Sequence, residues 1–323
     1  KETTCESAPY VLKNLGYSTH AVHNNEANFY GRRSIFPNLG FDTFTSAEYM
    51  AEENDKNPLG WTKDEVLTDE IIKCLDSTEG PDYVYTISTQ GHGAYPEEQL
   101  IDDPEITVTG AATEAQNNQW EYYCNEIHEM DNFVKELTDA LADYPEDVIL
   151  VMYGDHLPTM GLTVEDLKNK YLFQTEYVMW DNFGMEKKKV NLSAYQMAAE
   201  VMDRAGIHEG TIFRYHQARR NTRNYQVDLE TLQYDLLYGE KYAYKDKELT
   251  FERTKMRMGI YDVSLDSMDL VPVGKVLPVV YYSSLHPASE HPCFFCIPDK
   301  RACHQSVHLR GRLQTGVRFP AVT

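Results

Sequence analysis

The sequence predicts an α/β fold in which a mostly parallel sheet has helices on both faces and is followed by late β strands. Segments with strand character alternate with segments of helical periodicity along most of the chain. Residues 148–152 are apolar at every position, as expected of a parallel strand that is buried on both faces. Residues 120–141 carry apolar side chains at alternating spacings of three and four, which is typical of an amphipathic helix.

A short helix and a strand are expected first. Ser7 as the cap, Pro9 in the first turn and Gly16 as the stop predict the helix. Residues 19–23 then favour a strand that runs into a polar loop.

A second helix and strand follow. Thr62 and Glu65 have the spacing of a capping box, which predicts a helix that continues to about Leu75. Gly80-Pro81-Asp82 ends this helix, and residues 83–88 form a β-rich run.

The longest predicted helix has an apolar stripe and ends at Tyr144-Pro145. Its stripe consists of Trp120, Tyr123, Ile127, Met130, Val134, Leu137 and Leu141. Strands are expected at 148–152 and 177–180, and Ser193 with Gln196 forms a second capping-box pattern, for a helix that ends at Gly206. Residues 207–250 are expected to be connecting structure, with the late strands at 249–253 and 260–265.

Composition excludes several functional classes. The chain has 323 residues, and 30 Lys and Arg against 51 Asp and Glu give a net charge of −21. Such an acidic surface repels phosphate backbones, so nucleic acid is not an expected partner. No apolar run approaches the length needed to cross a bilayer, and the chain reads as a piece of a longer protein.

The composition changes at Val271. Six basic residues against two acidic ones give residues 271–323 a charge of +4, which leaves −25 for residues 1–270. We predict that residues 271–323 are a tail of foreign or aberrant composition that does not pack on the domain. The alternative is a zinc site, whose candidate ligands are Cys293, Cys296, Cys303 and His304.

Three predicted strands end in histidine-bearing segments. These are His23-Asn-Asn25, Gln90-Gly-His92 and Gly154-Asp155-His156. Because ligands bind beyond the carboxyl ends of parallel strands, the three segments are expected to converge on one site. A carboxylate and an imidazole suit Mn²⁺ or Zn²⁺ better than Ca²⁺, so Asp155 and His156 are the candidate metal ligands.

The loop after the first strand adds Tyr30, Arg32 and Arg33. Paired arginines in an acidic protein indicate an anionic substrate, because guanidinium matches phosphate or sulfate oxygens; the alternative is plain surface solvation. The acidic residues Glu97, Glu98, Asp102 and Asp103 form either a further ligand set or a solvated loop.

These motifs resemble a known family. His23-Asn-Asn-Glu-Ala-Asn-Phe-Tyr-Gly-Arg32, Leu39-Gly-Phe-Asp-Thr-Phe44, Ser88-Thr-Gln-Gly-His-Gly-Ala-Tyr-Pro96 and Val151-Met-Tyr-Gly-Asp-His-Leu-Pro158 are similar to segments of lipoteichoic acid synthases and related phosphoglycerol transferases. These enzymes are the sulfatase-like branch of the alkaline phosphatase superfamily. The resemblance covers about residues 1–270, with a catalytic domain over 1–250 and its late strands over 251–270.

The resemblance implies roles for individual residues. It implies that Asp155 and His156 bind Mn²⁺, another divalent metal being possible. It also implies that His23, Arg32 and His92 hold a glycerophosphate group. The same pocket would include Asn25 and Tyr30, where the family usually has Asp and Trp.

The resemblance further implies a reaction. In the family a metal-binding Glu and a nucleophilic Thr precede the first His motif; Thr3 and Thr4 lie too close to His23 to be that nucleophile. The intact enzyme would transfer glycerophosphate from phosphatidylglycerol to a glycan or polymer acceptor at the extracellular face of the membrane, anchored by amino-terminal helices. The chain alone is then expected to be inactive. The alternatives are a phosphatase or sulfatase of the same superfamily and a non-catalytic surface domain.

Overall fold

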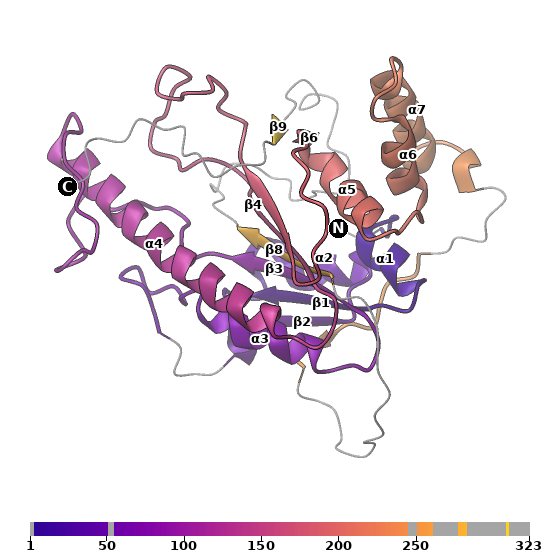
Figure 1. Cartoon of the computed structure of the whole chain (residues 1–323), viewed down its shortest axis with the longest axis horizontal. Helices are drawn as coiled ribbons and strands as arrows, with labels where there is room; N and C mark the ends of the chain where they lie inside the picture. The colour runs from indigo at the N-terminus through magenta and orange to yellow at the C-terminus, as the bar shows by residue number, and fades with distance from the viewer. Residues whose placement is uncertain (1–2, 51–54, 245–250, 261–276, 283–307, 310–323) are drawn as a thin grey trace.

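A computed structural model describes residues 3–50, 55–244, 251–260, 277–282 and 308–309. Its centre is a seven-stranded sheet in the order β5-β4-β8-β3-β1-β2-β7 (Figure 1). The strands are β1 Ser18–His23, β2 Thr43–Ser46, β3 Asp82–Ser88, β4 Ile149–Gly154, β5 Tyr177–Asp181, β7 Arg257–Met258 and β8 Leu277–Tyr282. A separate antiparallel pair joins β6 Leu192–Ser193 to β9 His308–Leu309.

The sheet is parallel apart from its edge strand β5, which runs antiparallel to β4. The predicted strands at 19–23, 83–88, 148–152 and 177–180 are thus confirmed with shifts of one or two residues. The predicted fold class, a mostly parallel sheet with helices on both faces, is confirmed as well.

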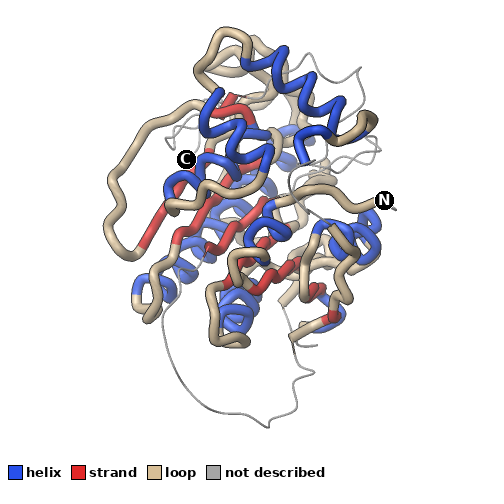
Figure 2. Tube along the Cα trace, turned by 90° about the vertical axis from the view of Figure 1, so that its right-hand side faces the viewer, coloured by secondary structure: helices blue, strands red, loops and turns tan. Residues whose placement is uncertain are grey.

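Helices cover the sheet on both sides (Figures 1 and 2). One apolar cluster joins the sheet to α1, α2, α5 and α6, and a second joins the opposite face to α3 and α4. The helices are α1 Ala8–Lys13, α2 Arg32–Leu39, α3 Val66–Leu75, α4 Glu114–Ala142, α5 Met197–Arg204, α6 Thr211–Arg219 and α7 Tyr225–Leu237. None of the described helices is long and apolar enough to cross a membrane.

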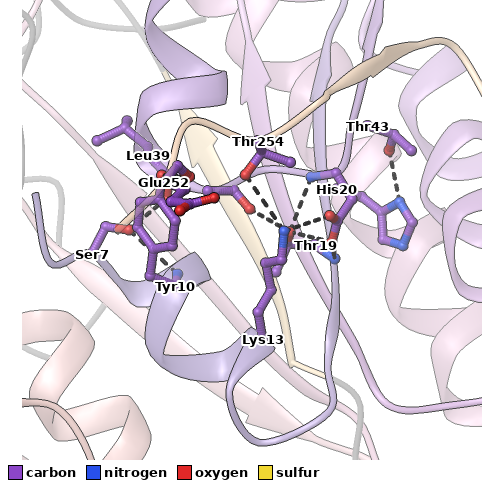
Figure 3. Close-up of polar contacts among 11 residues, drawn as sticks. Ser7, Tyr10, Lys13, Thr19, His20, Leu39, Thr43, Glu252 and Thr254 are labelled. Atoms are coloured by element: carbon purple, nitrogen blue, oxygen red, sulfur yellow. Dashed lines mark hydrogen bonds and ion pairs between the residues drawn. The ribbon is translucent and has the colours of Figure 1, made fainter. Parts of the chain in front are cut away.

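Helix α1 begins as predicted, because the Ser7 side chain accepts a hydrogen bond from the backbone N–H of Tyr10. Side chains of α1 also hold the late segment 251–254 against the sheet (Figure 3). The Tyr10 hydroxyl donates to the carbonyl of Glu252 at 2.7 Å, and Lys13 Nζ donates to Asp42 at 2.6 Å and to Thr254 at 3.5 Å.

One of the two predicted capping boxes is wrong. Helix α3 has Glu65 at its N-cap without a side-chain cap, while Thr62 forms a bridge with Lys56 and lies buried. The loop that precedes α3 uses Thr62 for its own folding, so the side chain cannot serve the helix. The box at Ser193 and Gln196 is confirmed, and the backbone N–H of Ser193 donates to Gln196 Oε1 at 2.9 Å.

The stripe predicted for α4 packs on the sheet only in the second half of the helix, although Trp120 in the first half is also buried. Phe133, Leu137 and Leu141 are buried against the sheet, whereas Ile127 is 37% exposed. The amino-terminal half extends past the sheet and contacts loops instead, so that half buries polar residues such as Glu121 and Glu126.

The structure adds elements that the sequence did not predict. Helix α2 and strand β2 lie where a polar loop was expected, and α6 and α7 lie in the segment 207–250. The late strand is β7, Arg257–Met258, which pairs with β2. The backbone N–H of Arg257 donates to the carbonyl of Asp42, just before β2, and that of Gly259 donates to the carbonyl of Phe44 in β2. Residues 251–253 and 260 are not strands, so the predicted late strands at 249–253 and 260–265 are wrong there; the rest of them lies outside the described residues.

The prediction that residues 271–323 do not pack on the domain is wrong for two segments, because β8 joins the central sheet and β9 pairs with β6. Strand β8 lies between β3 and β4, where Leu277 is opposite Tyr83 and Tyr282 is opposite Ser88. Two valines and two tyrosines give this segment strand propensity, although Pro278 cannot donate a ladder hydrogen bond. The candidate zinc ligands lie outside the described residues, and the foreign origin of the tail stays a prediction.

The halves of α4 should differ in their contribution to stability. Leu137→Ala should lower the free energy of unfolding by about 2–5 kcal/mol, because it opens a cavity in a fully buried site. The control Ile127→Ala, at a position that is 37% exposed, should cost about 1 kcal/mol or less. Urea unfolding followed by circular dichroism measures both; equal losses would contradict the packing described for α4.

Candidate functional site

The three histidine-bearing segments leave the same edge of the sheet. His23, the last residue of β1, lies opposite Ile87 of β3. Ser88 of β3 and Gly154 of β4 both lie opposite Tyr282 of β8. The predicted convergence of the strand ends is therefore confirmed, and the loops after β1, β3 and β4 form the candidate site.

His23 is fully buried and uses both ring nitrogens. Its Nδ1 lies 2.9 Å from the carbonyl oxygen of Ile87, and its Nε2 lies 3.1 Å from Nη1 of Arg32. A carbonyl can only accept and a guanidinium can only donate, so the ring proton is on Nδ1 and Nε2 accepts. Burial, and then the Arg32 charge, hold the pKa of His23 well below its usual range. His23 is thus a neutral acceptor that orients Arg32.

Arg32 is the first residue of α2 and is also buried. Its guanidinium carbon lies 5.4 Å from the ring centroids of both Phe29 and Tyr30, within the range of cation–π attraction. Nη1 also donates to the carbonyl of Phe29 at 3.3 Å. Left-handed backbone at Tyr30 (φ 54°) and Gly31 (φ 72°) makes the tight turn that folds the rings over the guanidinium.

His92 comes from the loop after β3 and is mostly buried. Its backbone N–H donates to the carbonyl of Thr89 at 3.0 Å, and its Nδ1 donates to the carbonyl of Gly93. In the neutral ring this leaves Nε2 as the acceptor. The Trp61 ring lies beside the imidazole at a centroid distance of 5.3 Å, a neighbour that sequence reasoning missed.

Asn25 and Arg33 have no contact with His23 or His92 among the hydrogen bonds described above. The Asn25 side chain accepts a hydrogen bond from the backbone N–H of Glu26 at 2.7 Å and thus stabilises its own turn. Arg33 is exposed, whereas Asn24, which the sequence did not single out, is buried beneath the site.

Asp155 and His156 follow β4 at the same edge. His156 Nδ1 donates to the carbonyl of Leu157 at 2.7 Å, which turns Nε2 toward Asp155 Oδ1 at 4.0 Å. One metal ion with bonds of about 2.1 Å could just reach both donors, and a backbone carbonyl that orients a histidine is the usual support of a metal ligand. The pair therefore fits a divalent cation, as two ligands of a larger set.

The part of the chain that the structure describes does not contain a complete metal site. Among these residues no group of three or more His, Cys, Asp or Glu is arranged to hold a metal ion. Glu97, Glu98, Asp102 and Asp103 are exposed, which favours the solvated loop over a further ligand set.

Tyr85 links the two halves of the site electrostatically. Burial raises the pKa of its phenol, the Arg32 charge lowers it and the Asp155 charge raises it. The phenol also forms a hydrogen bond with Tyr153, from the strand that leads to Asp155. The phenol thus feels both the cation on the β1 side and the carboxylate on the β4 side.

The neutral state of His23 predicts a pH dependence of stability. The unfolded chain takes up a proton at His23 near pH 6.5, whereas the folded protein does not, so stability is lost as the pH falls below that value. Between pH 6.5 and 5.5 the loss from this residue should be about 1 kcal/mol. In His23→Gln, which keeps a donor and an acceptor, the loss should be smaller by that amount. Urea unfolding at both pH values measures the difference, and equal losses in the two proteins would refute a neutral His23.

Known proteins are similar to this chain in sequence. Residues 1–207 match the family model described as Sulfatase. In Rhizobium meliloti (strain 1021), a protein named for cyclic beta-1,2-glucan modification is 26% identical over 270 residues, which are 71% of this chain and 42% of that protein. Lipoteichoic acid synthase 1 of Bacillus subtilis (strain 168) is 30% identical over 158 residues, 48% of this chain and 24% of the synthase.

A solved structure shows the fold. The Streptococcus pyogenes phosphoglycerol transferase GacH, solved in complex with sn-glycerol-1-phosphate, superposes on this chain with a TM-score of 0.60 at 23% sequence identity. The superposition covers 75% of this chain and 65% of the GacH chain. The chain spans less than half the length of the two curated relatives. With its mostly parallel sheet, its histidine-bearing strand ends and the family match over most of its length, the chain belongs to the Sulfatase family.

Proposed function

We propose that the chain is part of a metal-dependent phosphoglycerol transferase, which moves glycerophosphate from a phosphatidylglycerol-type donor to a cell-envelope polymer or glycan. The observation that carries the proposal is the buried guanidinium of Arg32, oriented by His23 at the edge where His92 and Asp155 also lie. The family itself includes transferases and other sulfatase-like enzymes, so the choice of glycerophosphate is the proposal.

A buried cation in this protein favours an anionic ligand. The chain carries a net charge of −21, so an anion that approaches its surface is repelled except where positive charge is concentrated. The contacts of Arg32 with His23, Phe29 and Tyr30 are with neutral groups, and they position the guanidinium. A phosphate could accept two parallel hydrogen bonds from that planar fork.

His92 supplies a different contact. With its proton held on Nδ1 by Gly93, a neutral His92 offers Nε2 as an acceptor, which suits a glycerol hydroxyl. The neighbouring Trp61 ring gives this side of the site an apolar wall. A phosphate at Arg32 and a hydroxylated carbon chain at His92 match the two parts of a glycerophosphate group. The complex of GacH with sn-glycerol-1-phosphate supports this choice of ligand.

Asp155 and His156 would hold Mn²⁺ or another divalent cation. A bound cation would supply Lewis-acid charge that offsets the negative charge of a phosphoryl group. The residues of the chain itself bind and orient the ligand. Arg32 binds phosphate oxygens, His23 orients Arg32, and Nε2 of His92 accepts a hydrogen bond from a glycerol hydroxyl.

The nucleophile is expected from another segment. The hydroxyls closest to the histidine loop, those of Ser88 and Thr89, are buried and donate to Asp64 and Asn24. They are thus engaged inside the protein and do not face a substrate. Following the family resemblance, we propose a threonine upstream of the first histidine motif, in a parent protein whose catalytic domain lies at the extracellular face of the membrane.

The first test concerns the anion. Arg32→Ala should weaken binding of sn-glycerol 1-phosphate to the chain about 10- to 100-fold, since charge-assisted hydrogen bonds contribute about 1.5–3 kcal/mol. Arg33→Ala, which removes the neighbouring exposed charge, should change the affinity less than threefold. Titration calorimetry measures both, and equal effects would exclude Arg32 as the anion site.

The second test concerns the metal. Mn²⁺ followed by electron paramagnetic resonance should bind weakly to the chain, because two protein ligands leave most positions to water. Asp155→Asn and His156→Ala should each abolish this binding, whereas Asp103→Asn in the exposed acidic loop should leave it unchanged. If Asp103→Asn abolished binding and Asp155→Asn did not, the metal would belong to the acidic loop.

Product analysis of the intact parent separates transfer from hydrolysis. A glycerophosphoryl-acceptor product supports the transferase. Free glycerol phosphate as the sole product would show a phosphatase-type enzyme of the same family.

A further inference from the structure

We propose that Asp64 is a positioning residue that ties the loop after β1 to the loop after β3, and thereby sets Arg32 and His92 relative to each other. The inference rests on the proposed function, because it assigns both loops to one glycerophosphate site. Asp64 precedes α3 in sequence and lies far from both histidine motifs along the chain. Its side chain is nevertheless fully buried at the edge where β1 and β3 end.

Asp64 contacts both loops directly. One carboxylate oxygen accepts from Asn24 Nδ2 at 2.8 Å, and the other accepts from Ser88 Oγ at 2.7 Å. The backbone N–H of Asp64 donates to Gln90 Oε1 at 2.7 Å. Asp64 thus holds Asn24, which follows His23, as well as Ser88 and Gln90, which precede His92.

Asn24 closes the connection. Its Oδ1 accepts from the backbone N–H of Thr89 at 3.1 Å and from the Thr89 hydroxyl at 3.0 Å, while Nδ2 also donates to the carbonyl of Thr62 at 2.9 Å. The Thr89 carbonyl in turn accepts a hydrogen bond from the backbone N–H of His92. The hydrogen bonds form a continuous path from Asp64 through Asn24 and Thr89 to His92. Because His23 precedes Asn24 and holds Arg32, the path continues to the guanidinium.

A carboxylate suits this position better than an amide. Its two oxygens accept from both Asn24 Nδ2 and Ser88 Oγ, whereas an amide would offer one acceptor and one donor. Burial raises the pKa of this carboxyl to about 6 even though hydrogen bonds from Ser88 and Asn24 lower it, so the ionised form is costly to keep. The fold retains this cost at a point that joins two loops of the site, which fits a role in positioning.

Asp64→Asn tests the proposal, with Asp69→Asn as the matched control on the exposed side of α3. In Asp64→Asn the new NH2 group would face either Asn24 Nδ2, which is also a donor, or the Ser88 hydroxyl, which would have to turn from donor to acceptor, so the coupling of the two loops should weaken. We expect the affinity for sn-glycerol 1-phosphate to fall at least tenfold, and the Thr89 amide to exchange its hydrogen at least tenfold faster. Asp69→Asn should change each quantity less than twofold.

Two further variants separate positioning from a general loss of structure. The exchange Asn24→Asp with Asp64→Asn restores a donor–acceptor pair between the two positions but removes the donor to the Thr62 carbonyl, so it should recover part of the lost affinity. An affinity no better than that of Asp64→Asn alone would contradict coupling through this pair. If Asp64→Asn does not fold, Ser88→Ala, which removes one of the two donors, should still weaken binding about threefold and accelerate exchange at Thr89.

The outcomes distinguish the two proposals. Binding by the wild type with no change in affinity or Thr89 exchange in Asp64→Asn would overturn the role of Asp64 and leave the proposed function intact. Absence of sn-glycerol 1-phosphate binding in the wild type would overturn the proposed function. In that case the Thr89 amide alone would decide the coupling: faster exchange in Asp64→Asn supports it, and unchanged exchange refutes it.

Discussion

The parallel pairing of β1 with β3 sets the geometry of the whole carboxyl edge of the sheet. Because His23 lies opposite Ile87, its Nδ1 can donate to the Ile87 carbonyl, and its Nε2 then points at Arg32. The same register places Asn24 against Thr89. A shift of one residue would turn His23 to the other face of the sheet and break every one of these contacts. The site therefore depends on a backbone register that no single site residue provides.

Burial of polar groups is the cost of this arrangement. His23, Asn24, Arg32 and Asp64 are all buried, although groups of this kind usually remain exposed to water. Each is compensated by its neighbours: His23 stays neutral, the Arg32 guanidinium lies near two aromatic rings, and the Asp64 carboxylate accepts two hydrogen bonds. Such a fully connected network holds its members in one arrangement, because the loss of one partner leaves another buried and unsatisfied. A site that must orient a phosphate benefits from this rigidity.

Local patterns predicted those elements whose cause is local. The run 148–152 and the cap at Ser7 became β4 and the start of α1, since apolar continuity and a capping hydroxyl act within a few residues. The pattern at Thr62 failed because Lys56 Nζ, in the loop before the helix, donates a hydrogen bond to the Thr62 hydroxyl, which therefore serves the loop and not the helix. The stripe on α4 failed at Ile127 because the helix extends beyond the sheet, and periodicity does not reveal where a partner surface ends.

The sequence by itself determined the fold class, the three histidine-bearing strand ends and the family, because these reside in hydrophobic periodicity and in short contiguous motifs. It also singled out His23, Arg32, His92, Asp155 and His156. Tertiary structure alone decided that Asn24 and not Asn25 lies beneath the site, and that Asp64 and Trp61 belong to it. It also placed Leu277–Tyr282 inside the sheet. The physical reason is that these contacts join residues tens to hundreds of positions apart, and strand register and loop packing, which no local pattern encodes, bring them together.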